Sequence, residues 1–295
     1  MCSVSLIIVH IDLKISISKN KHARGNKKAF TPPAAQRADR HVLYEQAVQC
    51  VEAEIDMVDD TFKQLRGRQA RFLREDFCGT ANTSCEWVKR RDDNHAFSVD
   101  LDPAVLRWGL EHNVSRLERH SQERIDLRQA DVCSCDIRQM DIVVAMNFSY
   151  QLFKTRDTLR HYFHTVHESL GNDGIFFIDV YGGYESFREI EEATEYDNFT
   201  YIWDQARYNP INGDLLCYIH FSFPDGSRMR KAFRYDWRLW TLPELQELLS
   251  EAGFDRVLVH WEGTDEKTNE GNGVFTATDI GEADASWICY ISAER

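Results

Sequence analysis

The sequence predicts an α/β protein with a doubly wound, mostly parallel, seven-stranded sheet and an inserted antiparallel β-structure. Two observations lead to this fold class. Between residues 71 and 180, short apolar runs alternate with segments whose apolar residues recur at helical spacing, which is typical of parallel strands with crossover helices. Between residues 200 and 240, strand-like segments follow one another directly through Asn-Gly and Asp-Gly turns, which is typical of an antiparallel meander.

The parallel part is expected to contain five strands with helices between them. Asp102 followed by Pro103 marks the start of one of these helices, because Asp caps helices well and Pro suits the first helical position. Thr241 and Glu244 form a second start signal, a capping box. The expected strands are residues 71–76, 95–100, 124–128, 141–146 and 175–180, and the expected helices are residues 42–65 (one or two), 81–89, 103–113, 155–170 and 241–252.

The antiparallel insertion is expected to contain three strands, at residues 200–208, 215–223 and 229–240. Two further strands, at residues 257–261 and 286–293, then complete the main sheet. The domain prediction is therefore one main domain over residues 41–293, with residues 182–240 inserted as a lid over the strand ends.

Composition limits the classes of function. The 295 residues include 17 Phe, 11 Tyr and 7 Trp, enough to form a sizeable core. A net charge of −13 disfavours a nucleic-acid partner. Eight scattered cysteines suit reduced thiols, so we expect a cytoplasmic protein. No apolar run approaches the roughly 20 residues of a membrane span, so no membrane association is expected.

The first forty residues differ from the rest. An apolar run at residues 4–11 precedes six Lys and Arg residues, which is the reverse of the order in a signal peptide. We predict that residues 1–40 form a disordered extension. A targeting segment and an added strand stay as alternatives.

The segment after the first expected strand carries the most information about a ligand. It reads Arg-Glu-Asp-Phe-Cys-Gly-Thr-Ala over residues 74–81, and such a turn lies where ligands bind in doubly wound sheets. Asp100 ends the second strand, 21 residues after Gly79, where a carboxylate can accept ribose hydroxyls. Because the loop has a single glycine and two acids, Glu75 and Asp76, it favours a cationic nucleoside without phosphates.

These motifs resemble class I S-adenosylmethionine-dependent methyltransferases over nearly all of residues 42–293. The resemblance implies a Rossmann-like fold and S-adenosylmethionine as cofactor. It places Glu75 at the methionyl end of the cofactor, Asp100 on the ribose and Leu101 against the adenine. Phe77 and Ala81 stand where the family usually has glycine. The implied cofactor-binding set is Glu75, Phe77, Gly79, Asp100, Leu101, Asp131, Val132 and Asn147.

Several readings of these residues stay open. Asp76 is an alternative to Glu75, and Asp131 an ordinary loop acid as an alternative to an adenine ligand. Cys133-Ser-Cys135 has no second pair at zinc spacing, so no metal site is expected.

The predicted function is methylation of a small molecule, at nitrogen, since the insertion resembles the substrate lids of small-molecule N-methyltransferases such as glycine N-methyltransferase. Asn147 and Tyr150, which follow the fourth strand, are the predicted catalytic residues, with Tyr44 and Tyr181 as further candidates. A non-catalytic S-adenosylmethionine-binding partner protein and a protein methyltransferase are the alternatives.

Overall fold

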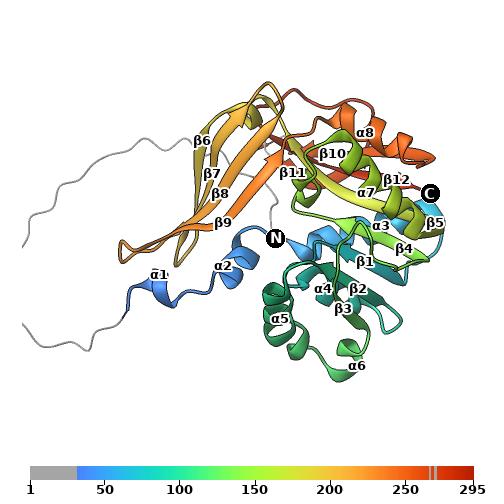
Figure 1. Cartoon of the computed structure of the whole chain (residues 1–295), viewed down its shortest axis with the longest axis horizontal. Coiled ribbons are helices and arrows are strands. Elements are labelled where there is room, and N and C mark those ends of the chain that lie inside the picture. The colour runs from blue at the N-terminus through green and yellow to red at the C-terminus, as the bar shows by residue number, and fades with distance from the viewer. Residues whose placement is uncertain (1–31, 266, 269–270) are drawn as a thin grey trace, which may run out of the picture.

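The computed structural model describes residues 32–265, 267–268 and 271–295. These residues form an eight-stranded sheet and, beside it, a separate four-stranded sheet (Figure 1). The strand order of the large sheet is β11-β10-β12-β5-β4-β1-β2-β3. In the described part, no helix is both long and apolar enough to cross a membrane.

The large sheet confirms the predicted doubly wound, mostly parallel architecture. Its parallel strands are β1 (Phe72–Asp76), β2 (His95–Asp100), β3 (Ile125–Gln129), β4 (Met140–Ala145) and β5 (Leu170–Gly182). The antiparallel strands are β10 (Arg256–Thr264), β11 (Gly271–Ala277) and β12 (Trp287–Glu294). The sheet therefore has eight strands rather than the predicted seven. The eighth strand, β11, escapes prediction because it is an exposed edge strand that contains two glycines and no apolar alternation.

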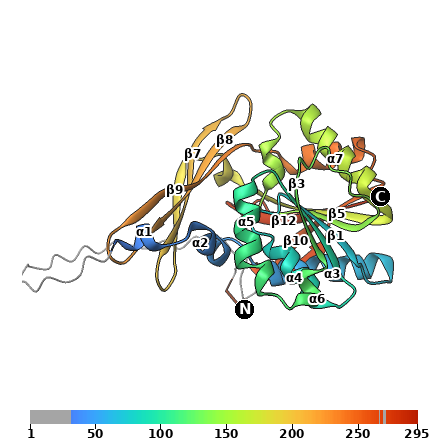
Figure 2. The same ribbon diagram turned by 60° about the horizontal axis from the view of Figure 1, so that its bottom comes forward.

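Helices cover both faces of this sheet (Figure 2). On one face, α3 (Val51–Arg66) and α4 (Asn82–Arg90) bury Val58, Phe62 and Trp87 against the strands. On the other face, α7 (Arg156–Ser169) and α8 (Leu242–Glu251) form a second core layer. The remaining elements near this sheet are α5 (Pro103–His112), α6 (Arg119–Gln122), and the short 3-10 helices η1 (Val114–Arg116), η2 (Ser149–Leu152) and η3 (Tyr184–Phe187).

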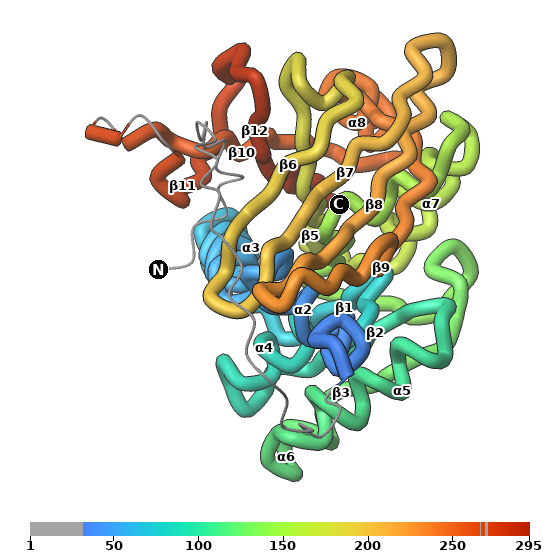
Figure 3. Tube along the Cα trace, turned by 90° about the vertical axis from the view of Figure 1, so that its left-hand side faces the viewer, coloured from blue at the N-terminus to red at the C-terminus, as the bar shows by residue number. Residues whose placement is uncertain are grey.

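The second sheet is fully antiparallel (Figure 3). It contains β6 (Ile190–Glu195), β7 (Thr200–Asn209), β8 (Asp214–Ser222) and β9 (Arg228–Arg238). The three predicted strands are present, and their connecting turns place Gly213 and Gly226 at positive φ, as Asn-Gly and Asp-Gly turns require. Half of the residues of the additional strand, β6, are acidic, so it lacks a strand-like apolar pattern.

Two short helices at the start of the described chain contact the second sheet. They are α1 (Ala34–Arg37) and α2 (Arg40–Ala47). The Ala34 N–H donates to Asp225 in the β8–β9 turn at 2.8 Å. The ring centroids of Tyr44 and Phe233 lie 4.9 Å apart. Helical structure therefore starts before the expected domain boundary at residue 41. The apolar run at residues 4–11 lies outside the described residues.

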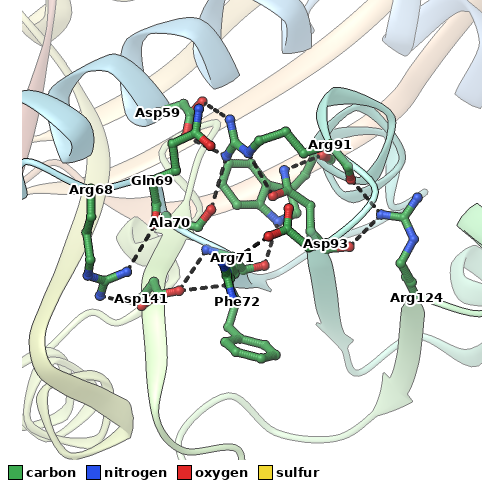
Figure 4. Close-up of polar contacts among 12 residues, drawn as sticks. Asp59, Arg68, Gln69, Ala70, Arg71, Phe72, Arg91, Asp93, Arg124 and Asp141 are labelled. Carbon is green, nitrogen blue, oxygen red and sulfur yellow. Dashed lines mark hydrogen bonds and ion pairs between the residues drawn. The ribbon is translucent and has the colours of Figure 1, made fainter.

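A polar network closes the amino-terminal edge of the large sheet (Figure 4). Asp141 in β4 accepts hydrogen bonds from the backbone N–H groups of Arg71 and Phe72, at 2.7 and 3.0 Å. Its second oxygen accepts from Arg68 at 2.6 Å. Nearby, Arg91 pairs with Asp59. Asp141 therefore fixes the entry of the chain into β1, the strand that leads to the predicted ligand loop.

We expect the Asp141→Asn substitution to lower the free energy of unfolding by about 1–3 kcal/mol. Asn has one acceptor oxygen, so it cannot serve both the backbone N–H groups and Arg68. Urea denaturation measures the difference. The matched control is Asp136→Asn, since Asp136 is highly exposed and, among the described residues, pairs only with Arg138. It should change stability by less than about 0.5 kcal/mol. Equal effects of the two substitutions would contradict this role of Asp141.

Candidate functional site

The loop between β1 and α4 has an unusual backbone. Phe77, Gly79 and Ala81 all have positive φ, near 50–60°. The loop is attached to the end of β2, because Cys78 N–H donates to Val99 O at 3.0 Å and Gly79 N–H donates to Asp100 Oδ2 at 2.9 Å. A Cβ atom placed on Gly79 would meet no other atom within 4 Å, so open space lies beside this residue.

Asp100 and Leu101 lie next to that open space. The Asp100 carboxylate also accepts from the Asp102 N–H at 2.9 Å, and each of its oxygens still has a lone pair for a further donor. Leu101 is 66% exposed, so most of its apolar side chain is open to solvent. As predicted, Asp102 caps α5 and accepts from Ala104 N–H at 2.8 Å.

The two acids of β1 point to opposite faces of the sheet. Asp76 is buried, pairs with Arg74 at 2.6 Å and accepts from the Tyr162 hydroxyl at 2.8 Å. Glu75 lies on the α4 side and accepts from the N–H of Ser84 at 2.9 Å and from its hydroxyl. Burial raises the pKa of Glu75 to about 7. Asp76 is thus a core residue, and Glu75 supports the first turn of α4 beneath the loop; its direct contact with a ligand stays a prediction.

The segment after β3 reaches the same edge of the sheet. Ala130 N–H donates to the backbone oxygen of Asp100 at 3.0 Å, which places residues 130–132 beside the end of β2. Asp131 is exposed and its carboxylate accepts from Cys133 N–H at 2.9 Å, while Val132 is buried. The structure therefore brings together Gly79, Asp100 and Asp131 at the carboxyl ends of β1, β2 and β3.

The turn after β4 carries a second strained backbone. Asn147 and Phe148 both adopt left-handed φ, at 57° and 56°, although neither is glycine. Their N–H groups donate to the two oxygens of Asp179 in β5, at 2.8 and 2.9 Å. Burial raises the pKa of Asp179 to about 8. Strained, non-glycine residues are concentrated at functional sites. Asp179, which holds this turn, was not among the site residues predicted from the sequence.

Tyr150 is not among the residues that line the cavity described next, and its predicted catalytic role stays a prediction. Its side chain is fully buried in the core formed with α7 and α8. Its hydroxyl has no hydrogen-bond partner among the described residues. Burial raises the pKa of Tyr150, and the nearby Asp179 contributes to the increase. Tyr44 and Tyr181, by contrast, both line the cavity described next.

A cavity of about 380 Å³ lies between the carboxyl ends of β4 and β5 and the second sheet. Asn147, Phe148 and Asp179 form part of its wall, and α2 and α3 contribute Tyr44 and Glu54. The second sheet adds an aromatic cluster in which ring centroids lie 4.5–6.1 Å apart; its members are Trp203, Tyr235 and Trp237.

Glu54 is the most unusual residue of this cavity. It lies on the buried side of α3 with Ile55 and Val58, and only 7% of it is exposed. Its Oε2 atom has no hydrogen-bond partner among the described residues. Burial raises the pKa of Glu54 to about 7, and the nearby Glu54 carboxyl in turn contributes to the raised pKa of Asp179.

Comparisons with known proteins bear on the fold. No family model matches the chain, and no curated protein matches it. A solved S-adenosylmethionine-dependent methyltransferase from Clostridium acetobutylicum is similar, with a TM-score of 0.62, 16% identity, and coverage of 86% of this chain and 96% of that one. The fold is therefore that of the S-adenosylmethionine-dependent methyltransferases.

Two further structures with this methyltransferase fold cover nearly the whole chain. An amino pentose methyltransferase from Micromonospora echinaspora has a TM-score of 0.60 and 14% identity, covering 92% of this chain and 100% of that one. A sugar N-methyltransferase from Streptoalloteichus has a TM-score of 0.59 and 18% identity, covering 94% of this chain and 99% of that one. The similarity includes most of the chain and therefore extends beyond the parallel strands alone.

The raised pKa of Glu54 predicts a pH dependence of stability. In the unfolded chain its pKa returns to about 4.5, so between about pH 4.5 and 7 the folded protein binds the extra proton. The free energy of unfolding therefore falls as the pH rises through this window and stays lower above it. Relative to wild type, Glu54→Gln should gain on the order of 1–3 kcal/mol between pH 5 and pH 8. Urea denaturation at both pH values measures this gain.

The control for this prediction is Glu52→Gln. Glu52 lies in the same helical turn but is exposed. The free energy of unfolding of the Glu52→Gln variant should change between the two pH values as that of the wild type does. If Glu54→Gln also ran parallel to the wild type, the burial of an ionisable Glu54 in the folded protein would be contradicted.

Proposed function

We propose that this protein is an S-adenosylmethionine-dependent methyltransferase that transfers a methyl group to a nitrogen atom of a small molecule. The observation that carries the proposal is the adjacency of two sites at one edge of the large sheet. No atom lies within 4 Å of a Cβ placed on Gly79, so the loop is open on this side. Because β1 and β4 are neighbouring parallel strands, the turn after β4, which lines the cavity, leaves the same edge of the sheet as this loop.

The residues of the loop region fit S-adenosylmethionine. The spare lone pairs of the Asp100 carboxylate suit the two hydroxyls of a ribose. The exposed Leu101 side chain offers an apolar surface for adenine. The loop itself contributes no Lys or Arg from Phe77 to Ala81, which suits a ligand without phosphates. We assign Phe77, Asp131, Val132 and Asn147 to the same site as the sequence predicts, and Glu75 as the acid that supports the loop.

The chemistry then depends on position and on exclusion of water. When bound, S-adenosylmethionine supplies a methyl group on a positively charged sulfur, ready for in-line displacement by a nucleophile. Asp100 and the loop hold the nucleoside at the carboxyl ends of the strands. Asn147 and Phe148, fixed by Asp179, form the boundary between the loop region and the cavity. Enclosure by the second sheet orients the acceptor and keeps water out, and such positioning is the main source of rate enhancement in displacements of this kind.

We assign residues 182–240 to the lid that covers the acceptor. Trp203, Tyr235 and Trp237 of this segment line the cavity, while the residues proposed for the cofactor lie outside it. The cavity volume of about 380 Å³ suits a small molecule. Nitrogen as the acceptor atom is supported by the acidic lining of the cavity, and one of the similar folds is a sugar N-methyltransferase.

Asp100→Ala should weaken the binding of S-adenosylhomocysteine by about ten- to a hundredfold. The loss corresponds to about 1.5–3 kcal/mol for hydrogen bonds to a charged group. Isothermal titration calorimetry measures it, with circular dichroism to confirm the fold, because Asp100 also holds the Gly79 N–H. The control is Asp126→Ala, since Asp126 in β3 lies at the surface and its ion pair in the described part of the chain is with Arg128. Unchanged affinity of Asp100→Ala would contradict the cofactor site.

Methyl transfer itself is tested by incubating the protein with methyl-labelled S-adenosylmethionine and fractionated cell metabolites. The label should move to a low-molecular-weight amine. Transfer to proteins alone, or binding of the cofactor without any transfer, would contradict the proposal.

A further inference from the structure

Acidic side chains line the cavity between the two sheets and select the molecule that it binds. We propose that it admits the acceptor as a protonated amine on an uncharged, largely apolar body, and that Glu54 determines this specificity by binding the ammonium group. The ammonium nitrogen has no lone pair, so it gives one proton to the Glu54 carboxylate and attacks the methyl group as the neutral amine. The inference rests on the proposed function, since it names the class of acceptor for the same site. It also excludes acceptors whose phosphate or carboxylate group would have to enter the cavity.

The lining of the cavity is acidic on every side. Glu54 of α3, Asp179 of β5, Glu185 of η3 and Glu192 of β6 line it, and Glu185 also pairs with Arg188 at 2.6 Å. Among the described lining residues there is no Lys, Arg or His. Electrostatic interactions are strong in a partly enclosed site of low dielectric. An anionic group would therefore meet carboxyl groups and no basic side chain among these residues, whereas an ammonium group would meet carboxyl acceptors.

Glu54 has a buried carboxyl oxygen without a hydrogen-bond partner among the described residues. Both oxygens of Asp179 already accept backbone N–H groups, those of Asn147 and Phe148. Glu54 Oε2 accepts nothing among the described residues, although the side chain is more than nine-tenths buried. A buried carboxyl oxygen without a hydrogen-bond partner is unfavourable in the free protein. An ammonium group supplies the missing donor and the compensating charge together.

The position of Glu54 and Asp179 on the same side of the sheet follows from the strand. In β5, Ile175 and Phe177 pack with α3 and α4, whereas Phe176 and Ile178 pack with α7 and α8. Asp179 continues the first series, so it faces the side of the sheet on which α3 presents Glu54. An ammonium group at Glu54 is thereby adjacent to the Asn147–Phe148 turn, where the cavity meets the proposed cofactor site.

The opposite wall suits both a cation and an apolar body. Trp203, Tyr235 and Trp237 line it as a cluster of rings. Aromatic faces attract ammonium groups, and the attraction grows when water is excluded. None of the cation–aromatic contacts found among the described residues involves these rings. Their faces are therefore free of the protein's own cations.

Three probes of similar shape and different charge test the inference: 2-phenylethylamine, 2-phenylethanol and phenylacetate. Their binding to the full chain, saturated with S-adenosylhomocysteine, is measured at neutral pH by ligand-observed NMR. We expect the amine to bind with a Kd of about 1 mM or tighter and at least about tenfold more tightly than the alcohol, with phenylacetate weakest. Glu54→Gln should remove most of the preference for the amine and leave the affinity for the alcohol within about threefold.

Glu52→Gln is the matched control, because it removes the same charge from an exposed position in the same turn of α3. It should keep the full preference for the amine. The wild-type comparison of the three probes stands even if Glu54→Gln does not fold. The inference is overturned if the alcohol or phenylacetate binds the wild type as well as the amine does, if the amine does not bind, or if a folded Glu54→Gln variant keeps the amine preference.

The design separates this inference from the proposed function. Failure of S-adenosylhomocysteine to bind would overturn the proposed function. Normal S-adenosylhomocysteine binding without a preference for the amine would leave the methyltransferase proposal intact and overturn only the assignment of the acceptor class.

Discussion

The paired hydrogen bonds of Asp179 are the interaction on which the site depends. Two consecutive non-glycine residues, Asn147 and Phe148, leave β4 in the left-handed conformation, which costs roughly 1–2 kcal/mol for each residue. The carboxyl group of Asp179 offsets this cost by accepting both of their N–H groups. Without this contact the chain after β4 would follow a more relaxed course, and the boundary between the nucleoside region and the cavity would lose its shape. Neighbouring parallel strands, β4 and β5, make the contact possible because their carboxyl ends lie side by side.

Burial explains why some strands were predictable from the sequence and others were not. The central strands β4 and β5 are predictable because they are largely buried on both faces and therefore rich in consecutive apolar residues, as in residues 142–145. The strands β6 and β11 lie at sheet edges, where no burial requires an apolar pattern, and both escaped prediction. Asp102 could be identified as a cap because capping is local chemistry.

The site residues divide in the same way. Gly79 and Asp100 belong to a local motif at a strand end, and the structure brings them into contact as the motif suggests. Glu54 depends on long-range packing, since an acid in a helix is normally solvated. The available signal was its position one residue before Ile55 and four before Val58, within the buried stripe of α3. Tyr150 shows the opposite case, because its nearness in sequence to Asn147 says nothing of the direction in which η2 turns its side chain.

Helix α2 makes the two regions of the site mechanically dependent on each other. On one side, Glu45 accepts from the Thr80 hydroxyl in the ligand loop at 2.6 Å and from Asn113, which follows α5, at 2.7 Å. On the other side, the adjacent Tyr44 packs on Phe233 of the second sheet and faces the cavity. One turn of helix thus contacts the loop proposed to hold the nucleoside and the wall proposed to hold the acceptor. A displacement of the loop must therefore be transmitted to the cavity wall, or break the Glu45 hydrogen bonds. Because a displacement reaction requires the two reactants at a fixed separation, a single short helix tied to both sites is an economical way to set that separation.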